Sequence, residues 1–113
     1  MYILVRTSLC PDLKKQISDL IDEEEIDAWQ FIVEDGKRRL MHKPSDCKYD
    51  DVVLRFITTL VDGVSYIKIL PTFRTGVENQ MGANMHKGIV LGRFAELLNT
   101  HFDAIDQYTT ILE

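Results

Sequence analysis

The sequence has few of the residues that interrupt or cross-link a chain: its 113 residues include three prolines, six glycines and two cysteines. So little proline and glycine excludes a low-complexity linker. No apolar run approaches the roughly 20 residues that a helix needs to cross a bilayer, so a spanning helix is not expected. Cys10 and Cys47 lie far apart. We predict two free thiols, because a chain with enough apolar residues for a full core does not need a disulfide.

Apolar and charged residues, in contrast, are plentiful. Hydrophobic residues make up 45% and charged residues 27% of the chain, which is typical of one folded domain over residues 1–113. The net charge of -5 argues against nucleic acid as a partner. It favours solubility or association with a basic protein. Residues 1–6 lack the basic start and the cleavage site of a signal peptide, so we predict a cytoplasmic protein that contacts no membrane.

A strand and a helix are expected at the start of the chain. Residues 2–7 form a short apolar run of strand-forming residues. Pro11 suits the first position of a helix and Asp12 its first turn. The acidic residues 22–25 are expected to end this helix, because carboxylates at a helix C-terminus oppose its dipole. The apolar stripe of the helix consists of Leu13, Ile17, Leu20 and Ile21.

The pair Asp35-Gly36 predicts a β-hairpin over residues 28–42, because both residue types tolerate the positive φ angles of a two-residue turn. Such a turn determines the register of the two strands. It places Glu34 opposite Lys37, Phe31 opposite Leu40, and Trp29 opposite His42.

A second pair, Asp62-Gly63, predicts a second hairpin that joins residues 50–61 to residues 64–73. Residues 50–61 also fit the apolar stripe of a helix, with Gly63 just beyond its end. Their many β-branched residues favour the strand. In the hairpin, Val61 is opposite Val64, Thr58 opposite Ile67, and Phe56 opposite Ile69.

The last third is expected to contain a loop over 72–84, a helix over 85–102 and a strand over 106–112. Gly88 and Gly92 inside the helix each cost about 1 kcal/mol relative to alanine, so we expect a close approach of the sheet, or of a ligand, to offset that cost. The order β-α-β-β-β-β-α-β predicts an α+β fold, a two-layer sandwich of a mainly antiparallel sheet of about five to six strands with two helices on one face. The other face is expected to be partly polar, or to meet a second copy.

Two segments carry residue types that could perform chemistry. The loop from His42 to Tyr49 contains a histidine, lysines and Cys47, which is the composition of an activated thiol. We interpret it instead as a polar connection, because catalytic partners usually meet through the fold. No pair among the cysteines and histidines has the spacing of a metal site, so no metal and no cofactor is predicted.

The second segment is a candidate anion site. The strand over 64–73, the loop over 74–84, the glycine-containing helix and the final strand together resemble the part of acetyltransferase folds that receives a pyrophosphate at a helix N-terminus. The resemblance covers the last third of the chain, and the compact glycine-rich loop of that family is absent. It implies a ligand site formed by Arg74, Asn79, Asn84, His86 and Lys87.

No complete catalytic motif is present, so the sequence favours a non-catalytic interaction or accessory domain that binds a protein partner or forms a homodimer. The alternative is a small-ligand or anion-binding protein, or an acyltransferase-like enzyme, that uses residues 74–93. The catalytic residues of such an enzyme are not identifiable from the sequence.

Overall fold

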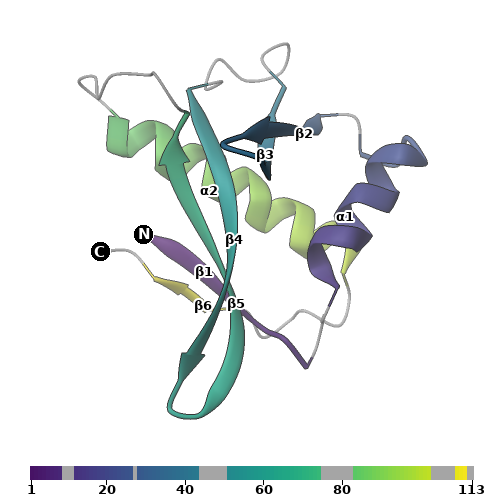
Figure 1. Cartoon of the computed structure of the whole chain (residues 1–113). Coiled ribbons are helices and arrows are strands. Elements are labelled where there is room, and N and C mark those ends of the chain that lie inside the picture. The colour runs from purple at the N-terminus through teal and green to yellow at the C-terminus, as the bar shows by residue number, and fades with distance from the viewer. Residues whose placement is uncertain (9–11, 27, 44–50, 75–82, 103–108, 112–113) are drawn as a thin grey trace.

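The computed structural model describes residues 1–8, 12–26, 28–43, 51–74, 83–102 and 109–111, apart from the side chains of residues 83, 84 and 109–111. Figure 1 shows six strands and two helices in the predicted order. The elements are β1 (Tyr2–Arg6), α1 (Leu13–Asp22), β2 (Trp29–Glu34), β3 (Lys37–His42), β4 (Val52–Val61), β5 (Val64–Phe73), α2 (Ala83–His101) and β6 (Thr109–Ile111).

Both predicted hairpins are present with the predicted registers. Asp35 and Gly36 have φ angles of 52° and 75°, and Asp62 and Gly63 have φ angles of 50° and 79°. Positive φ at both central residues is what a tight turn between right-twisted strands requires. The β4–β5 register, in which Val61 is opposite Val64, shows that residues 52–61 form a strand rather than a helix.

All neighbouring strands pair antiparallel in one sheet with the order β2-β3-β4-β5-β1-β6. The fold is therefore α+β, as predicted. The first helix begins at Leu13, two residues after the first helical position expected at Pro11. Asp12 is its N-cap residue and makes no side-chain capping hydrogen bond, so the prediction that Asp12 lies in the first turn is wrong. Pro11 lies outside the described residues.

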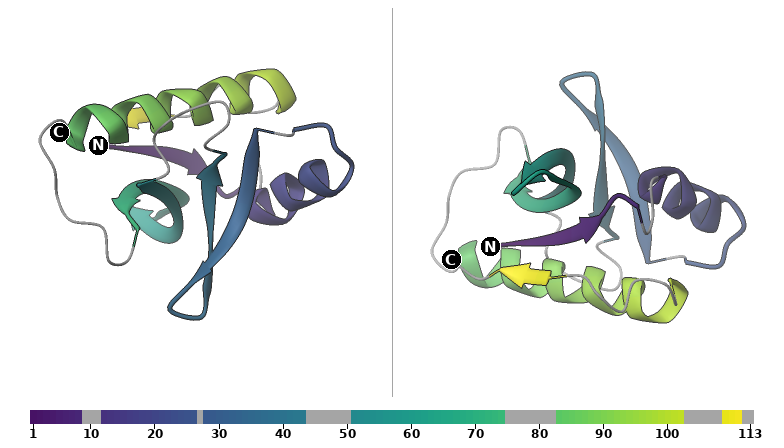
Figure 2. Two further views of the ribbon diagram at one scale, coloured as in Figure 1. Left: turned by 90° about the horizontal axis from the view of Figure 1, so that it is seen from above. Right: turned by 90° about the horizontal axis from the view of Figure 1, so that it is seen from below.

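One hydrophobic core lies between the sheet and the two helices. The inward side chains of paired strands, such as Ile3 opposite Ile69 and Leu40 opposite Leu54, are fully buried. Figure 2 shows α2 running along the sheet beside β1, with α1 next to the β2–β3 hairpin. Both helices contribute to the same buried cluster, through Leu13 and Ile17 of α1 and Val90, Leu91, Phe94, Leu97 and Leu98 of α2.

The second face of the sheet is partly polar, as predicted. Leu4, Met41 and Val53 are buried on it, whereas Arg39 and Arg55 also belong to this face by strand alternation. Among the described residues, no helix is long and apolar enough to cross a membrane.

The two glycines of α2 do not have the close contacts that we predicted for them. A Cβ atom at Gly88 would make an ordinary contact of 3.5 Å with the flexible Met1 side chain. A Cβ atom at Gly92 would meet no described atom within 4 Å. The expected close approach of the sheet is therefore wrong for Gly92, and nothing in the structure explains why this position is glycine.

Candidate functional site

The two hairpins separate from each other on one side of the sheet. β2 and β3 pair along six residues each, and β4 and β5 along ten each, but β3 and β4 are paired in the described residues only at Leu40 and Leu54. In Figure 2 the β2–β3 hairpin and the β4–β5 hairpin point in different directions. Residues 37–39 and 55–58, which would continue the pairing, line an opening instead.

We call this opening the cationic pocket. Its volume is about 510 Å³, within the range of small-ligand sites. No described carboxylate lines it. Its lining consists of Lys14, Lys37, Arg38, Arg39, Arg55, Phe56, Ile57 and Thr58. Five of the 13 lysines and arginines of an acidic chain thus surround a single opening.

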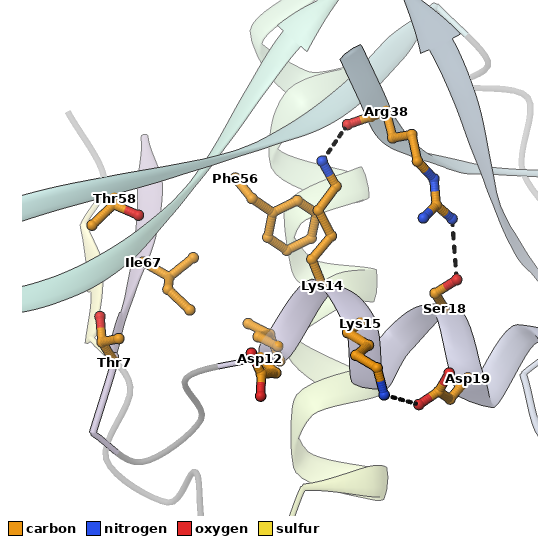
Figure 3. Close-up of a pocket in the computed structure, with 11 residues that line it drawn as sticks. Thr7, Asp12, Lys14, Lys15, Ser18, Asp19, Arg38, Phe56, Thr58 and Ile67 are labelled. Atoms are coloured by element: carbon orange, nitrogen blue, oxygen red, sulfur yellow. Dashed lines mark hydrogen bonds and ion pairs between the residues drawn. The ribbon is translucent and has the colours of Figure 1, made fainter.

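Lys14 lies where α1 meets the two hairpins. Its Nζ donates a hydrogen bond of 2.7 Å to the Arg38 carbonyl oxygen, and the Arg38 guanidinium donates one of 3.1 Å to the Ser18 hydroxyl. Figure 3 shows both hydrogen bonds, one made by the Lys14 side chain of α1 and the other by the Arg38 side chain of β3. The Arg38 guanidinium also lies 4.4 Å from the centre of the Phe31 ring. The two hydrogen bonds connect the β2–β3 hairpin to α1 beside the opening.

Arg39 lies on the opposite face of β3 from Arg38. Its Nε is 3.6 Å from a Glu34 carboxylate oxygen, and both side chains are mostly buried. The Nε atom has no hydrogen-bond partner among the described residues. Cations therefore line the cationic pocket from both faces of the sheet, with Lys14 and Arg38 on the α1 side and Arg39 and Arg55 on the other.

The pKa of Lys14 lies below its usual range. Partial burial of the Lys14 amine is the main cause, and repulsion by Arg38 and Arg39 adds to it. Below its pKa, the Lys14 ammonium adds to the local excess of positive charge. An anion in the cationic pocket would relieve this repulsion and raise the pKa of Lys14 again.

We therefore expect Arg38→Ala to raise the pKa of Lys14, because the variant removes one of the two repelling guanidinium groups but keeps the carbonyl that Lys14 binds. The measurement is an NMR titration that follows the Lys14 Cε signal. Arg93→Ala, on the exposed surface of α2, is the control and should leave the Lys14 pKa unchanged. An unchanged Lys14 pKa in Arg38→Ala would contradict the repulsion assigned to the Arg38 guanidinium.

The lowered pKa of Lys14 also links stability to pH. The folded state releases the Lys14 proton at a lower pH than the unfolded chain does, so this group makes the free energy of unfolding increase with pH between the two pKa values.

A second pocket, the α1 pocket, adjoins the cationic pocket and shares Lys14, Arg38, Phe56 and Thr58 with it. Its volume is about 480 Å³. Figure 3 shows it between the first turns of α1 and three other residues, Thr58 of β4, Ile67 of β5 and Thr7, which follows β1. Its lining is mixed, because Leu13 and Ile67 are apolar whereas Lys15 pairs with Asp19 at 3.4 Å. This pocket could accept a side chain that has both an apolar stem and a polar end.

The structure brings together part of the predicted anion site. The Arg74 backbone N–H donates to the Asp51 carbonyl oxygen at 2.8 Å, and His86 Nδ1 is 2.8 Å from an Asp51 carboxylate oxygen. Lys87 Nζ lies 4.6 Å from the centre of the Phe73 ring. Asn79 lies outside the described residues, and Asn84 is in the first turn of α2 with its side chain outside the description.

Asp51, at the centre of this group, was not predicted as a site residue. Its other carboxylate oxygen is buried without a hydrogen-bond partner among the described residues. A carboxylate in this position opposes the binding of an anion, since like charges repel. The four pockets described in this structure are lined by other residues than Arg74, His86 and Lys87.

Of the predicted segment from His42 to Tyr49, the structure describes two residues, His42 at the end of β3 and Lys43. His42 is 4% exposed, its ring centre lies 4.8 Å from that of Trp29, and its Nδ1 is 3.2 Å from the Lys43 carbonyl oxygen. Cys47 lies outside the described residues, as does Cys10. His42 is thus a packed residue whose ring completes the buried end of the first hairpin.

The residues of the cationic pocket were not predicted as a site, although two features of the sequence pointed to local positive charge. Lys37, Arg38 and Arg39 are consecutive, and Lys14 follows the expected start of a helix. Arg38 and Arg39 lie on opposite faces of β3, and both line one opening at the edge of that strand. Within the described part of the chain, no three histidine, cysteine or acidic side chains are grouped to hold a metal ion.

Comparisons with models of known protein families, with curated proteins and with solved structures find no match to this chain.

Proposed function

We propose that this chain is a non-catalytic interaction domain that holds an acidic segment of a protein partner in the cationic pocket. The observation that carries the proposal is the grouping of Lys14, Lys37, Arg38, Arg39 and Arg55 around one opening without a described carboxylate in its lining. Positive charges gathered in a concave, partly apolar site concentrate the field and attract anions more strongly than the same charges spread over a surface.

The composition of the cationic pocket supports binding rather than catalysis. Its described polar side chains are lysines, arginines and one threonine, with no histidine, cysteine or carboxylate to act as nucleophile or general base. Lys14, whose amine has the lowered pKa, is bonded to a carbonyl of the protein itself. The site thus offers charge and hydrogen bonds but no assembled reaction centre.

The net charge of the chain supports a compact acidic segment over nucleic acid as the ligand. Nucleic-acid-binding domains usually present a broad basic surface, whereas this chain has a net charge of -5 and its cations are gathered at one opening. The partner proposed here is acidic, in contrast to the basic partner that the net charge alone favours. The local field at the binding site, not the total charge, determines which groups bind there.

The direct test measures binding of a fluorescein-labelled peptide rich in Glu, Asp and Val by fluorescence anisotropy. An otherwise identical peptide with Gln and Asn in place of Glu and Asp is the control. We expect the acidic peptide to bind at least about tenfold more tightly at low salt, and the difference to shrink as added salt screens the charges. Equal binding of the two peptides, or no binding of the acidic one, would refute the proposed function.

A further inference from the structure

The separation of the hairpins leaves the part of β4 beyond Leu54 without a strand of the described residues on the β3 side. In a two-residue hairpin the closing residues, here Val61 and Val64, exchange hydrogen bonds, and the direction of the backbone groups then alternates along the strand. Residues 55, 57 and 59 therefore bond to β5. The backbone groups of Phe56 and Thr58 point away from β5, into the opening.

The backbone of β3 on the other side of the opening shows the same alternation. Leu40 is paired with Leu54, so the Arg38 carbonyl points toward Phe56 by the same rule. It is bonded by Lys14 Nζ rather than by β4. Lys14 of α1 thus occupies the Arg38 carbonyl on the β3 side of the opening, and the edge of β4 from Phe56 to Leu60 is the side that can accept a further strand. Thr58 and Leu60 are both exposed, and Leu60 is 71% exposed.

We propose that the acidic segment binds as an added β-strand along the Phe56–Leu60 edge of β4, an inference that rests on the proposed function. Backbone hydrogen bonds to an open sheet edge, with pockets for alternate side chains, are a general mode of peptide recognition. The α1 pocket, which Phe56 and Thr58 line, lies on the inward side of this edge and would take the side chains on that face of the added strand.

The positive charge on both faces of the opening indicates that the added strand is acidic. Side chains of a strand alternate between its two faces. An added strand would therefore have one set of side chains near Lys14 and Arg38, and the other set near Arg39 and Arg55. Acidic residues at adjacent positions of the segment would meet Lys14 and Arg38 on one face and Arg55 on the other, where Arg39 is 3.6 Å from Glu34. Apolar residues suit the deeper part of the α1 pocket, which Asp12 and Asp19 also line. A second copy of this chain, adding through the same edge, would instead bring the two groups of cations together, which disfavours self-association there.

The test uses the labelled peptide rich in Glu, Asp and Val in two N-methylated forms. One form has methyl groups on the backbone nitrogens of all odd residues, and the other on those of all even residues. Charge and side chains are identical in the two forms. An added strand directs alternate N–H groups at β4, so we expect one form to bind about tenfold or more weakly than the other. Equal affinities of the two forms would overturn strand addition while leaving acidic-segment binding intact. Failure of the parent peptide to bind would overturn both proposals.

Thr58→Pro provides a second readout on the protein. It removes the N–H that points into the opening and leaves the β4–β5 hydrogen bonds in place, a position at which edge strands tolerate proline. We expect it to weaken the parent peptide about tenfold, with thermal unfolding used to verify that the domain is folded. Unchanged affinity in a folded Thr58→Pro variant would contradict the proposal. A dimer of the chain that dissociates in the Thr58→Pro variant would also contradict it. The same holds if a single-stranded oligonucleotide binds as tightly as the acidic peptide and its affinity does not change in Thr58→Pro.

Discussion

Replacing Phe94 with alanine is expected to lower the free energy of unfolding by about 3–5 kcal/mol, the range for deleting a large buried aromatic side chain. Phe94 is fully buried in α2. Its ring meets Trp29 of β2 edge to face, with ring centres 6.0 Å apart, and Phe56 of β4, with ring centres 5.9 Å apart. It is therefore the side chain through which α2 contacts both hairpins.

The measurement is urea unfolding followed by tryptophan fluorescence, since the single tryptophan, Trp29, contacts Phe94. Arg93→Ala is the matched control at the neighbouring position, which is half-exposed, and should change stability by no more than about 0.5 kcal/mol. If the alanine variant is unfolded without urea, Phe94→Leu should still show a smaller loss. A loss below about 1.5 kcal/mol for Phe94→Ala would contradict the proposed central role of this contact in the core.

Reversing two charges of the cationic pocket, in the double variant Lys37→Glu and Arg55→Glu, is expected to weaken the acidic peptide about hundredfold. Each reversal replaces an attraction with a repulsion, and a change of about 1.4 kcal/mol per site corresponds to about tenfold per site. Both side chains line the cationic pocket, and neither belongs to the contacts described between α1 and β3. The effect is measured by fluorescence anisotropy at low salt.

The control is the double variant Lys43→Glu and Arg93→Glu, which changes the net charge by the same amount. Lys43 follows the opposite end of β3 from Lys37, and Arg93 lies on α2 and lines a different pocket. It should weaken the peptide only slightly, through the long-range field. Equal losses in the two double variants would show that net charge, rather than the cationic pocket, controls binding.

Local chemistry made the hairpins predictable. Asp35-Gly36 and Asp62-Gly63 can adopt the positive φ angles of a tight turn, and a two-residue turn determines the register of both strands without information from elsewhere in the chain. The apolar spacing of α1 similarly identified Leu13 and Ile17, which are fully buried. The start of the first helix was less predictable, because Asp12 can serve either as a cap or as a first-turn residue.

The site depends on contacts between residues distant in the sequence. Nothing near Lys14 indicates that its amine will bond to the Arg38 carbonyl, 24 residues away. His86 and Asp51, separated by 35 residues, could not be paired for the same reason. The predicted anion site therefore included His86 but not Asp51, whose carboxylate lies beside it in the structure. A charge count also gives the sign of the total field but not where the cations gather.

By itself, the sequence predicted most of the strands and helices, the register within each hairpin and many of the core side chains, because turn geometry and the alternation of apolar residues act over a few neighbouring positions. It favoured a strand over residues 50–61, and the pairing with β5 decided against the helix that the same residues also fitted. The tertiary structure alone decided that the two hairpins diverge beyond Leu40 and Leu54, where Lys14 of α1, rather than a residue of β4, bonds to the Arg38 carbonyl of β3. The same divergence turns three consecutive basic residues of one strand into part of a pocket beside an open strand edge.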